Sequence, residues 1–285
     1  VGPPSQATLV RPGGPICAFI KFVQALPYDE LADRIAEMGF DGIEATVRAG
    51  GHVLPERVEE DLPKLVEALR RRQLDVTVMA SEVNNPEDPG ERRVLETAAK
   101  LGIKRYRMKY FRYSGKRPVL EELEEFRPQA KRLAAANREL GLQAVYQNHA
   151  GPRYVGATLW DLQRLLRDIS PAEIGVAFDI RHATAAGGDS WAVLWDVVRP
   201  HVQTIYVKDF HWHKAADAAR QQMVNVPLGK GQVSPAFFAE LAKPPIQTLP
   251  VSLHVEYLKE SGVPENLEAL RRDLAKLRSL LANSR

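Results

Sequence analysis

Several short apolar segments of this sequence end in a charged or amide side chain, directly before a predicted loop. The clearest are 144–151 (AVYQNHAG), 174–183 (IGVAFDIRHA), 204–212 (TIYVKDFHW) and 251–257 (VSLHVEY), and 40–48 (FDGIEATVR) is a weaker example. Carboxylates, amides, lysine and histidine can transfer protons or bind cations and oxyanions, but they are costly inside an apolar core. Their positions predict an active site at the ends of strands, as at the carboxyl-terminal face of a parallel barrel.

Strand parity predicts which of these side chains meet. Alternate residues of a strand share one face. If those faces point inward, four strands bring together Gln147, Asp179, Lys208 and Glu256. Five of the seven histidines lie at or beside the same strand ends, at positions 149, 182, 211, 213 and 254. Asp209 is adjacent to Lys208 and therefore points to the opposite face, where it is expected to tie a loop.

Repeated strand–helix pairs position these residues. The strands are predicted at 16–20, 40–46, 74–80, 103–111, 142–147, 174–179, 202–209 and 249–257. The helices are predicted at 28–39, 54–72, 90–102, 121–141, 158–169, 190–199, 234–242 and 265–282. Gly39, Gly102 and Gly141 end three of these helices just before a strand.

The pair count predicts an α/β fold, a single (β/α)8 TIM barrel. About 36 residues per pair is close to the size of one barrel unit. A doubly wound open sheet would leave two or three pairs over, and no Gly-rich phosphate fingerprint follows the first strand. We predict one domain over residues 16–285, preceded by a flexible Gly/Pro-rich tail at 1–15.

Composition narrows the classes of function. The chain of 285 residues is 45% hydrophobic and 26% charged, with a net charge of +3, which gives no indication of a nucleic-acid or membrane partner. Cys17 is the single cysteine, so an intrachain disulfide is excluded. No apolar run approaches the roughly 20 residues of a membrane span. The sequence starts at Val1, and both a cytoplasmic and an exported protein are compatible with it, as is a homo-oligomer.

The motifs FDGIEATVRAGGHV, QNHAG, FDIRHA, VKDF and HVEY, in this order, resemble those of the sugar phosphate isomerase/epimerase family, the xylose isomerase-like TIM barrels. The resemblance covers roughly residues 16–260. It implies a divalent metal at the barrel mouth, held by Glu, Asp, His and Glu on strands five to eight. It also implies a small sugar or sugar derivative as the partner.

Two of the four implied ligand positions depart from this pattern. Asp179 and Glu256 match the family's Asp and Glu, and His182 matches a substrate-contacting histidine. Gln147 stands where the family has Glu, and Tyr206 stands where it has His. Because hard cations accept amide oxygens, we predict a weakened site for Mn, Mg, Zn or Ca formed by Gln147, Asp179 and Glu256.

Further residues are predicted to contact the substrate because they lie at or near predicted strand ends or in adjacent loops. Arg107 and Lys109 belong to a basic run, 104–117, that suits an oxyanion, although most of the run is expected to be solvated charge. The Trp212 ring suits the apolar face of a sugar. The full set of predicted substrate contacts is Glu44, His52, Arg107, Lys109, His149 and Trp212.

These residues favour a sugar isomerase or epimerase that abstracts a proton next to a carbonyl. Glu256 is expected to be the base, with His182 and Lys208 stabilising the enediolate oxygen. A lyase or dehydratase acting on a keto sugar is an alternative, since the altered ligand positions remove one acid/base group. A non-catalytic sugar-binding barrel is a second alternative. A metal-dependent nuclease on the same fold is disfavoured by the missing ligands and the balanced charge.

Overall fold

The computed structural model describes residues 13–214 and 221–283. Eight parallel strands form a closed barrel in the order β1-β10-β7-β6-β5-β4-β3-β2. They are β1 (Ile16–Phe19), β2 (Gly42–Val47), β3 (Asp75–Ser81), β4 (Arg105–Arg107), β5 (Gln143–Gln147), β6 (Ile174–Asp179), β7 (Val202–Val207) and β10 (Val251–Leu253). The prediction of a (β/α)8 barrel is therefore confirmed. Of the predicted tail, residues 1–12 lie outside the described residues.

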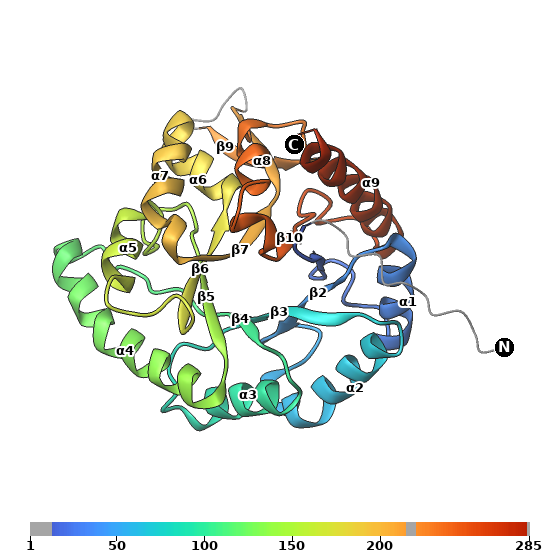
Figure 1. The fold of residues 1–285 in the computed structure, drawn as a ribbon, viewed down its shortest axis with the longest axis horizontal. Coiled ribbons are helices and arrows are strands. Elements are labelled where there is room, and N and C mark those ends of the chain that lie inside the picture. Colours follow the sequence, from blue (N-terminus) through green and yellow to red (C-terminus); the bar gives the residue numbers. More distant parts are fainter. Residues whose placement is uncertain (1–12, 215–220, 284–285) are drawn as a thin grey trace.

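Helices surround the barrel on its outside (Figure 1). The α-helices are α1 (Tyr28–Met38), α2 (Val58–Arg70), α3 (Pro89–Lys100), α4 (Val119–Leu140), α5 (Trp160–Leu166), α6 (Ile180–Gly187), α7 (Trp191–Val198), α8 (Ala236–Leu241) and α9 (Val263–Ala282). Short 3-10 helices occupy Pro55–Arg57, Gly188–Ser190, Arg199–His201 and Ile246–Thr248. As predicted, Gly39 and Gly141 cap α1 and α4 in the left-handed conformation that glycine adopts without strain.

Apolar side chains fill the molecule in two places. The main core lies between the strands and the surrounding helices. A smaller cluster lies inside the barrel and contains Val78, Val145, Ala177 and Tyr206. The barrel interior is thus filled with side chains at this level.

The structure differs from the predicted elements at four places. The fourth strand spans only Arg105–Arg107 instead of 103–111, and the eighth spans only Val251–Leu253 instead of 249–257. Helix α6 was not predicted, and it starts directly after β6 because the Asp179 side chain caps it by accepting the His182 N–H. An antiparallel hairpin, β8 (Asp209–His213) and β9 (Gln222–Val226), follows β7 at the barrel mouth, where part of a rim loop was expected.

Candidate active site

The side chains of three charged residues meet at the carboxyl-terminal ends of β6, β7 and β10. The Lys208 Nζ lies 3.1 Å from Asp179 Oδ2 and 3.1 Å from Glu256 Oε2. Gln147, the last residue of β5, donates from Nε2 to Asp179 Oδ2 at 2.7 Å. The predicted convergence of these four side chains is confirmed, whereas their chemical roles stay predictions.

Electrostatics keep all three charged groups ionised. Burial by itself would raise the pKa of Asp179 and of Glu256, but the Lys208 ammonium, together with His254 and hydrogen bonds, outweighs burial and holds both below their ordinary values. Burial would lower the pKa of Lys208, and the two carboxylates reverse this effect and raise it. One buried ammonium is therefore shared between two carboxylates.

The Gln147 amide oxygen is fully engaged. It accepts a hydrogen bond from Arg107 Nη1 at 2.9 Å and another from the Tyr110 hydroxyl at 2.5 Å. Since its Nε2 donates to Asp179, the orientation of the amide is fixed by its partners on both sides. Tyr110 thus belongs to the site, although the sequence analysis did not select it.

Two histidines in ring contact lie beside this cluster. The rings of His149 and His182 have centroids 4.0 Å apart and are tilted relative to each other. Burial, reinforced by Lys208, lowers the pKa of His149 to about 4, and burial lowers that of His182 as well, so both rings are neutral at pH 7. The His182 Nδ1 faces the N–H of Ala150 at 3.3 Å and the Arg181 guanidinium at 3.0 Å. The proton of His182 therefore belongs on Nε2, which is buried, lies 3.7 Å from Asp179 Oδ2 and makes no hydrogen bond among the described residues.

A cavity of about 610 Å³ opens above these residues. The predicted residues that line it are Arg107, Gln147, His149, His182, Lys208, Trp212 and Glu256. Asp179 lies just behind the wall and is fully buried. Trp212 extends from β8 and is 39% exposed, so one face of its ring is available to a ligand.

Three predicted substrate contacts are not at the cavity. Glu44 is fully buried below it, because β2 continues to Val47 and leaves Glu44 in mid-strand. The His52 ring packs against Tyr28 and contacts the Leu26 carbonyl at 3.0 Å. Lys109 is exposed outside the cavity. Because β4 ends at Arg107, the strand's alternation of inward and outward side chains does not extend to Lys109. These three assignments are therefore corrected.

Other cavity residues were not selected from the sequence. Arg48 follows the end of β2, and Arg181 is the second residue of α6. Both lie within motifs quoted above, FDGIEATVRAGGHV and FDIRHA, two residues after the predicted strand ends at 46 and 179, so a search of the second residue after each predicted strand end could have found them. Tyr110 offered no comparable signal, because it follows β4 by three residues within a basic run.

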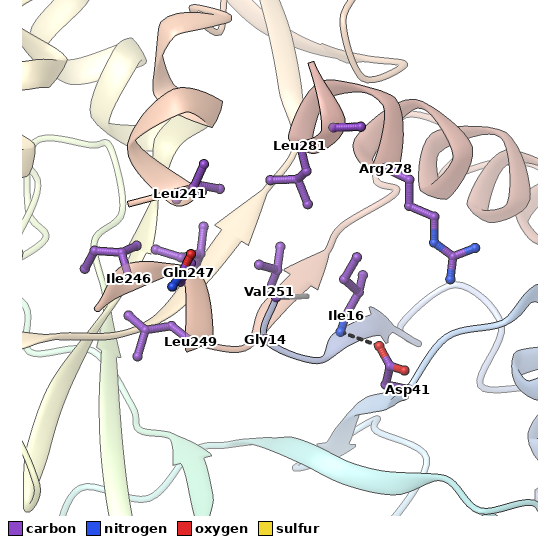
Figure 2. Close-up of a pocket in the computed structure, with 14 residues that line it drawn as sticks. Gly14, Ile16, Asp41, Leu241, Ile246, Gln247, Leu249, Val251, Arg278 and Leu281 are labelled. Carbon is purple, nitrogen blue, oxygen red and sulfur yellow. Dashed lines mark hydrogen bonds between the residues drawn. The ribbon is translucent and has the colours of Figure 1, made fainter. Parts of the chain in front are cut away.

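A second cavity, of about 490 Å³, lies at the opposite end of the barrel (Figure 2). Apolar side chains from the start of β10 and from α8 and α9 dominate it, among them Leu241, Leu249, Val251 and Leu281. Asp41 at its edge accepts the Ile16 N–H at 2.9 Å. No lysine or histidine lines this cavity within the ranges that the structure describes, so we place the chemistry at the other end.

The sequence of this barrel matches a known protein family. Residues 32–280 match the model of the xylose isomerase-like TIM barrel family. The chain belongs to this family. The resemblance found in the sequence is thereby confirmed, and no curated protein matches the chain.

Solved structures of the family share the fold at low sequence identity. A 3-keto-D-glucoside 4-epimerase from E. coli has 19% identity and a TM-score of 0.66, covering 93% of this chain and 99% of its own. A probable 3-DHS dehydratase from Bacillus anthracis has 17% identity and a TM-score of 0.62, covering 90% and 98%. A family barrel from Mycobacterium smegmatis, in complex with magnesium, has 16% identity and a TM-score of 0.61, covering 94% and 98%.

The residues of this family barrel do not fit the divalent metal that the resemblance implied. The Lys208 ammonium contacts both carboxylates, Gln147 presents its oxygen to Arg107 and Tyr110, and the Tyr206 hydroxyl donates to Glu44 at 2.9 Å. In residues 13–214 and 221–283, no group of three or more His, Cys, Asp and Glu side chains is arranged to hold a metal ion. The predicted ligand set of Gln147, Asp179 and Glu256 is thus occupied by partners within the protein.

None of the helices in the described ranges combines the length and the hydropathy needed to cross a membrane.

Proposed function

We propose that this protein is a sugar isomerase or epimerase that abstracts a proton next to a carbonyl group at the mouth of the barrel. The observation that carries the proposal is the contact of Lys208 with Asp179 and Glu256 at the floor of the 610 Å³ cavity. This contact places a base, Glu256, beside a fixed positive charge, Lys208, and formation of an enediolate requires both.

Glu256 is the proposed base. Its side chain is 18% exposed and lines the cavity, whereas Asp179 is fully enclosed. The ion pair with Lys208 lowers the pKa of Glu256 and keeps it deprotonated. When a substrate carbonyl draws the Lys208 ammonium toward it, that pairing weakens, and the carboxylate becomes more basic as the reaction begins.

Lys208 and His182 are the proposed stabilisers of the enediolate oxygen. The Lys208 Nζ retains a third donor beyond its two carboxylate contacts. His182 lines the cavity, and its Nε2–H makes no hydrogen bond in the described structure, with Asp179 Oδ2 at 3.7 Å. Asp179 positions both groups, since it caps α6 through the His182 N–H and pairs with Lys208. The charge that a metal supplies in other barrels is supplied here by Lys208.

Dehydration of a keto sugar is the second candidate, and a specific observation favours it. Among the described residues that line the cavity, Glu256 is the one carboxylate. Epimerisation returns the proton to the opposite face of the carbon, which requires a second acid, whereas elimination needs one base and an acid for the departing hydroxyl. The protonated ammonium of Lys208 can supply either second acid, whereas His149 on the cavity wall has a pKa of about 4 and is neutral at pH 7.

Proton exchange tests the proposal. The protein is incubated in D2O with a panel of keto and aldo sugars and their acids and phosphates, and NMR records deuterium entering at the carbon next to the carbonyl. We expect exchange in the parent and a loss of roughly 100-fold or more in Glu256→Gln. Glu260→Gln, an exposed residue of the following loop, is the matched control and is expected to keep the parent rate.

The outcomes separate the candidates. Exchange with recovery of a stereoisomer or positional isomer supports the isomerase, and an unsaturated or deoxy product with consumption of the sugar supports the dehydratase. Binding without exchange or product across the panel would overturn both and leave a sugar-binding barrel.

A further inference from the structure

The cavity carries far more positive than negative charge. Six cationic side chains line it: Lys21, Arg48, Arg107, Arg181, Lys208 and Lys259. Lys208 is neutralised by its two carboxylates. Within the described residues, the other five make no ion pair with any carboxylate, and Glu256 is already paired with Lys208.

This lack of pairing is unusual for the molecule. Arginines on the outer helices generally contact a carboxylate, as Arg72 contacts Asp33 at 2.7 Å and Arg92 contacts Glu139 at 2.6 Å. These outer pairs are exposed and are worth little energetically. Arg48, Arg107 and Arg181 differ from these helix arginines, because all three line one cavity and none of them pairs with a carboxylate.

Two of the cavity arginines are almost completely buried. Arg107 is 6% exposed and Arg181 is 7% exposed, and the Nε–H of each has no partner among the described residues. The Arg181 guanidinium is held over the Phe210 ring at 5.2 Å, which fixes its position. Carboxylates lie near both arginines, Asp179 and Glu256 near Arg181 and Glu44 near Arg107, but these are already bound by Lys208 and His254. Positive charge at the cavity therefore still exceeds negative charge, which is costly in a buried region and indicates a negatively charged ligand.

Three further cations come from the loops that follow β1, β2 and β10. Lys21, Arg48 and Lys259 all line the cavity. Burial lowers the pKa of Lys21, Glu256 opposes this effect, and Arg48 and Lys259 add to it. Arg48 also lies over the Phe19 ring at 5.9 Å. The cationic wall thus extends from the buried arginines to the rim.

We infer that the substrate carries an oxyanion, a carboxylate or a phosphate, and is a sugar acid or a sugar phosphate rather than a neutral sugar. Arg and Lys offer only donors, whereas the hydroxyls of a neutral sugar need acceptors as well, and the cavity supplies few of them. The sugar part of this inference rests on the proposed function. The requirement for a negative charge rests on the cavity alone.

The affinity of the intact protein for neutral and charged sugars tests the inference and does not require a catalysed reaction. Isothermal titration calorimetry compares D-glucose, D-glucuronate, D-gluconate and D-glucose 6-phosphate at low ionic strength and again with added NaCl. We expect at least one anion to bind roughly tenfold or more tightly than glucose, with an affinity that falls as salt rises. A preference for the two sugar acids assigns a carboxylate, and a preference for the phosphate ester assigns a phosphate. Equal or weaker binding of every anion than of glucose would overturn the inference.

Variants locate the effect. Arg181→Gln and Arg48→Gln are expected to reduce the preference for the anion, and the partly exposed Arg48 keeps the test informative if the buried variant does not fold. Arg93→Gln, an exposed arginine of α3 that lies 3.8 Å from Glu59, is the control and should bind like the parent. An unchanged preference in folded Arg181→Gln and Arg48→Gln would also overturn the inference.

Calorimetry and the proton-exchange measurement together separate this inference from the proposed function. Selective anion binding without proton exchange supports the charged ligand and contradicts the isomerase. Exchange on neutral sugars alone supports the isomerase and contradicts the charged ligand.

Discussion

Lys208 is the residue on which the chemistry of this barrel depends. Its ammonium lies 3.1 Å from an oxygen of each of two buried or nearly buried carboxylates. Removing a lysine from such a cluster leaves two negative charges close together in a region of low dielectric.

We therefore expect Lys208→Met to gain affinity for a divalent cation. Asp179 and Glu256 would present two carboxylates without a counter-ion, and Mn²⁺ accepts carboxylate oxygens readily. Calorimetric titration with Mn²⁺ should show binding at least roughly tenfold tighter than in the parent. Lys259→Met is the control, since Lys259 lines the same cavity without a carboxylate partner. Equal Mn²⁺ affinity in parent and Lys208→Met would show that the ammonium does not replace a metal.

The β8–β9 hairpin is the element that shapes the rim of the cavity. Trp212, Met223 and Asn225 extend from it into the cavity wall. Asp209, at its base, is 2% exposed and accepts four backbone N–H groups, from Phe210, Gly229, Gly231 and Val233. A Cβ at Gly231 would lie 2.2 Å from the Asp209 carboxylate, so this close approach requires glycine. The prediction that Asp209 ties a loop is thus confirmed.

Replacing Asp209 should loosen the rim. Asp209→Ala leaves four N–H groups without this acceptor, two of them buried, and we expect the free energy of unfolding to fall by about 3 kcal/mol. Urea titration followed by tryptophan fluorescence measures this loss. Asp209→Asn retains one carbonyl oxygen and should lose less. If the alanine and asparagine variants are as stable as the parent, the loop is held by other contacts.

At the scale of the whole molecule, Glu44 links strands that are distant in the sequence. It accepts hydrogen bonds from the Tyr206 hydroxyl at 2.9 Å and the Ser252 hydroxyl at 2.6 Å, and it contacts His254 Nε2 at 2.9 Å. These contacts cross the barrel from β2 to β7, β10 and the segment that follows β10. Burial would raise the pKa of Glu44, but His254 and Ser252 outweigh it and lower the pKa. Glu44 therefore stabilises the barrel interior instead of contacting substrate.

Glu44→Gln should destabilise the whole barrel in a way that depends on pH. Because the folded pKa is below the unfolded value of about 4.3, the carboxylate contributes stability above that pH and loses it as pH falls through the folded pKa. We expect a loss of about 3 kcal/mol at pH 7 and a smaller difference from the parent below about pH 4. Urea unfolding at both pH values measures it. A difference that stays constant with pH would contradict a role for the ionised carboxylate.

The sequence by itself determined the order of the elements and the meeting of the main site residues. Alternating strands and helices led to the barrel, because each pair carries its own periodicity and stop signals. Gln147 and Asp179 are the last residues of their strands, so parity within one strand was enough to direct them to the same end. These inferences needed only local information.

Only the tertiary structure decided how deep each side chain lies in the barrel. Depth depends on where neighbouring strands begin and on their register, which one strand's sequence does not contain. Asp179 pairs with Tyr206, so Lys208 lies above that pair, while Glu44 pairs with Phe19 and Val78 in mid-barrel. Because of that register, Glu44 lies in the barrel interior instead of at the cavity, and Arg48 lies at the rim of the cavity. The contact between Lys208 and both carboxylates, which displaces the expected metal site, likewise arises from three strands that only the closed barrel brings together.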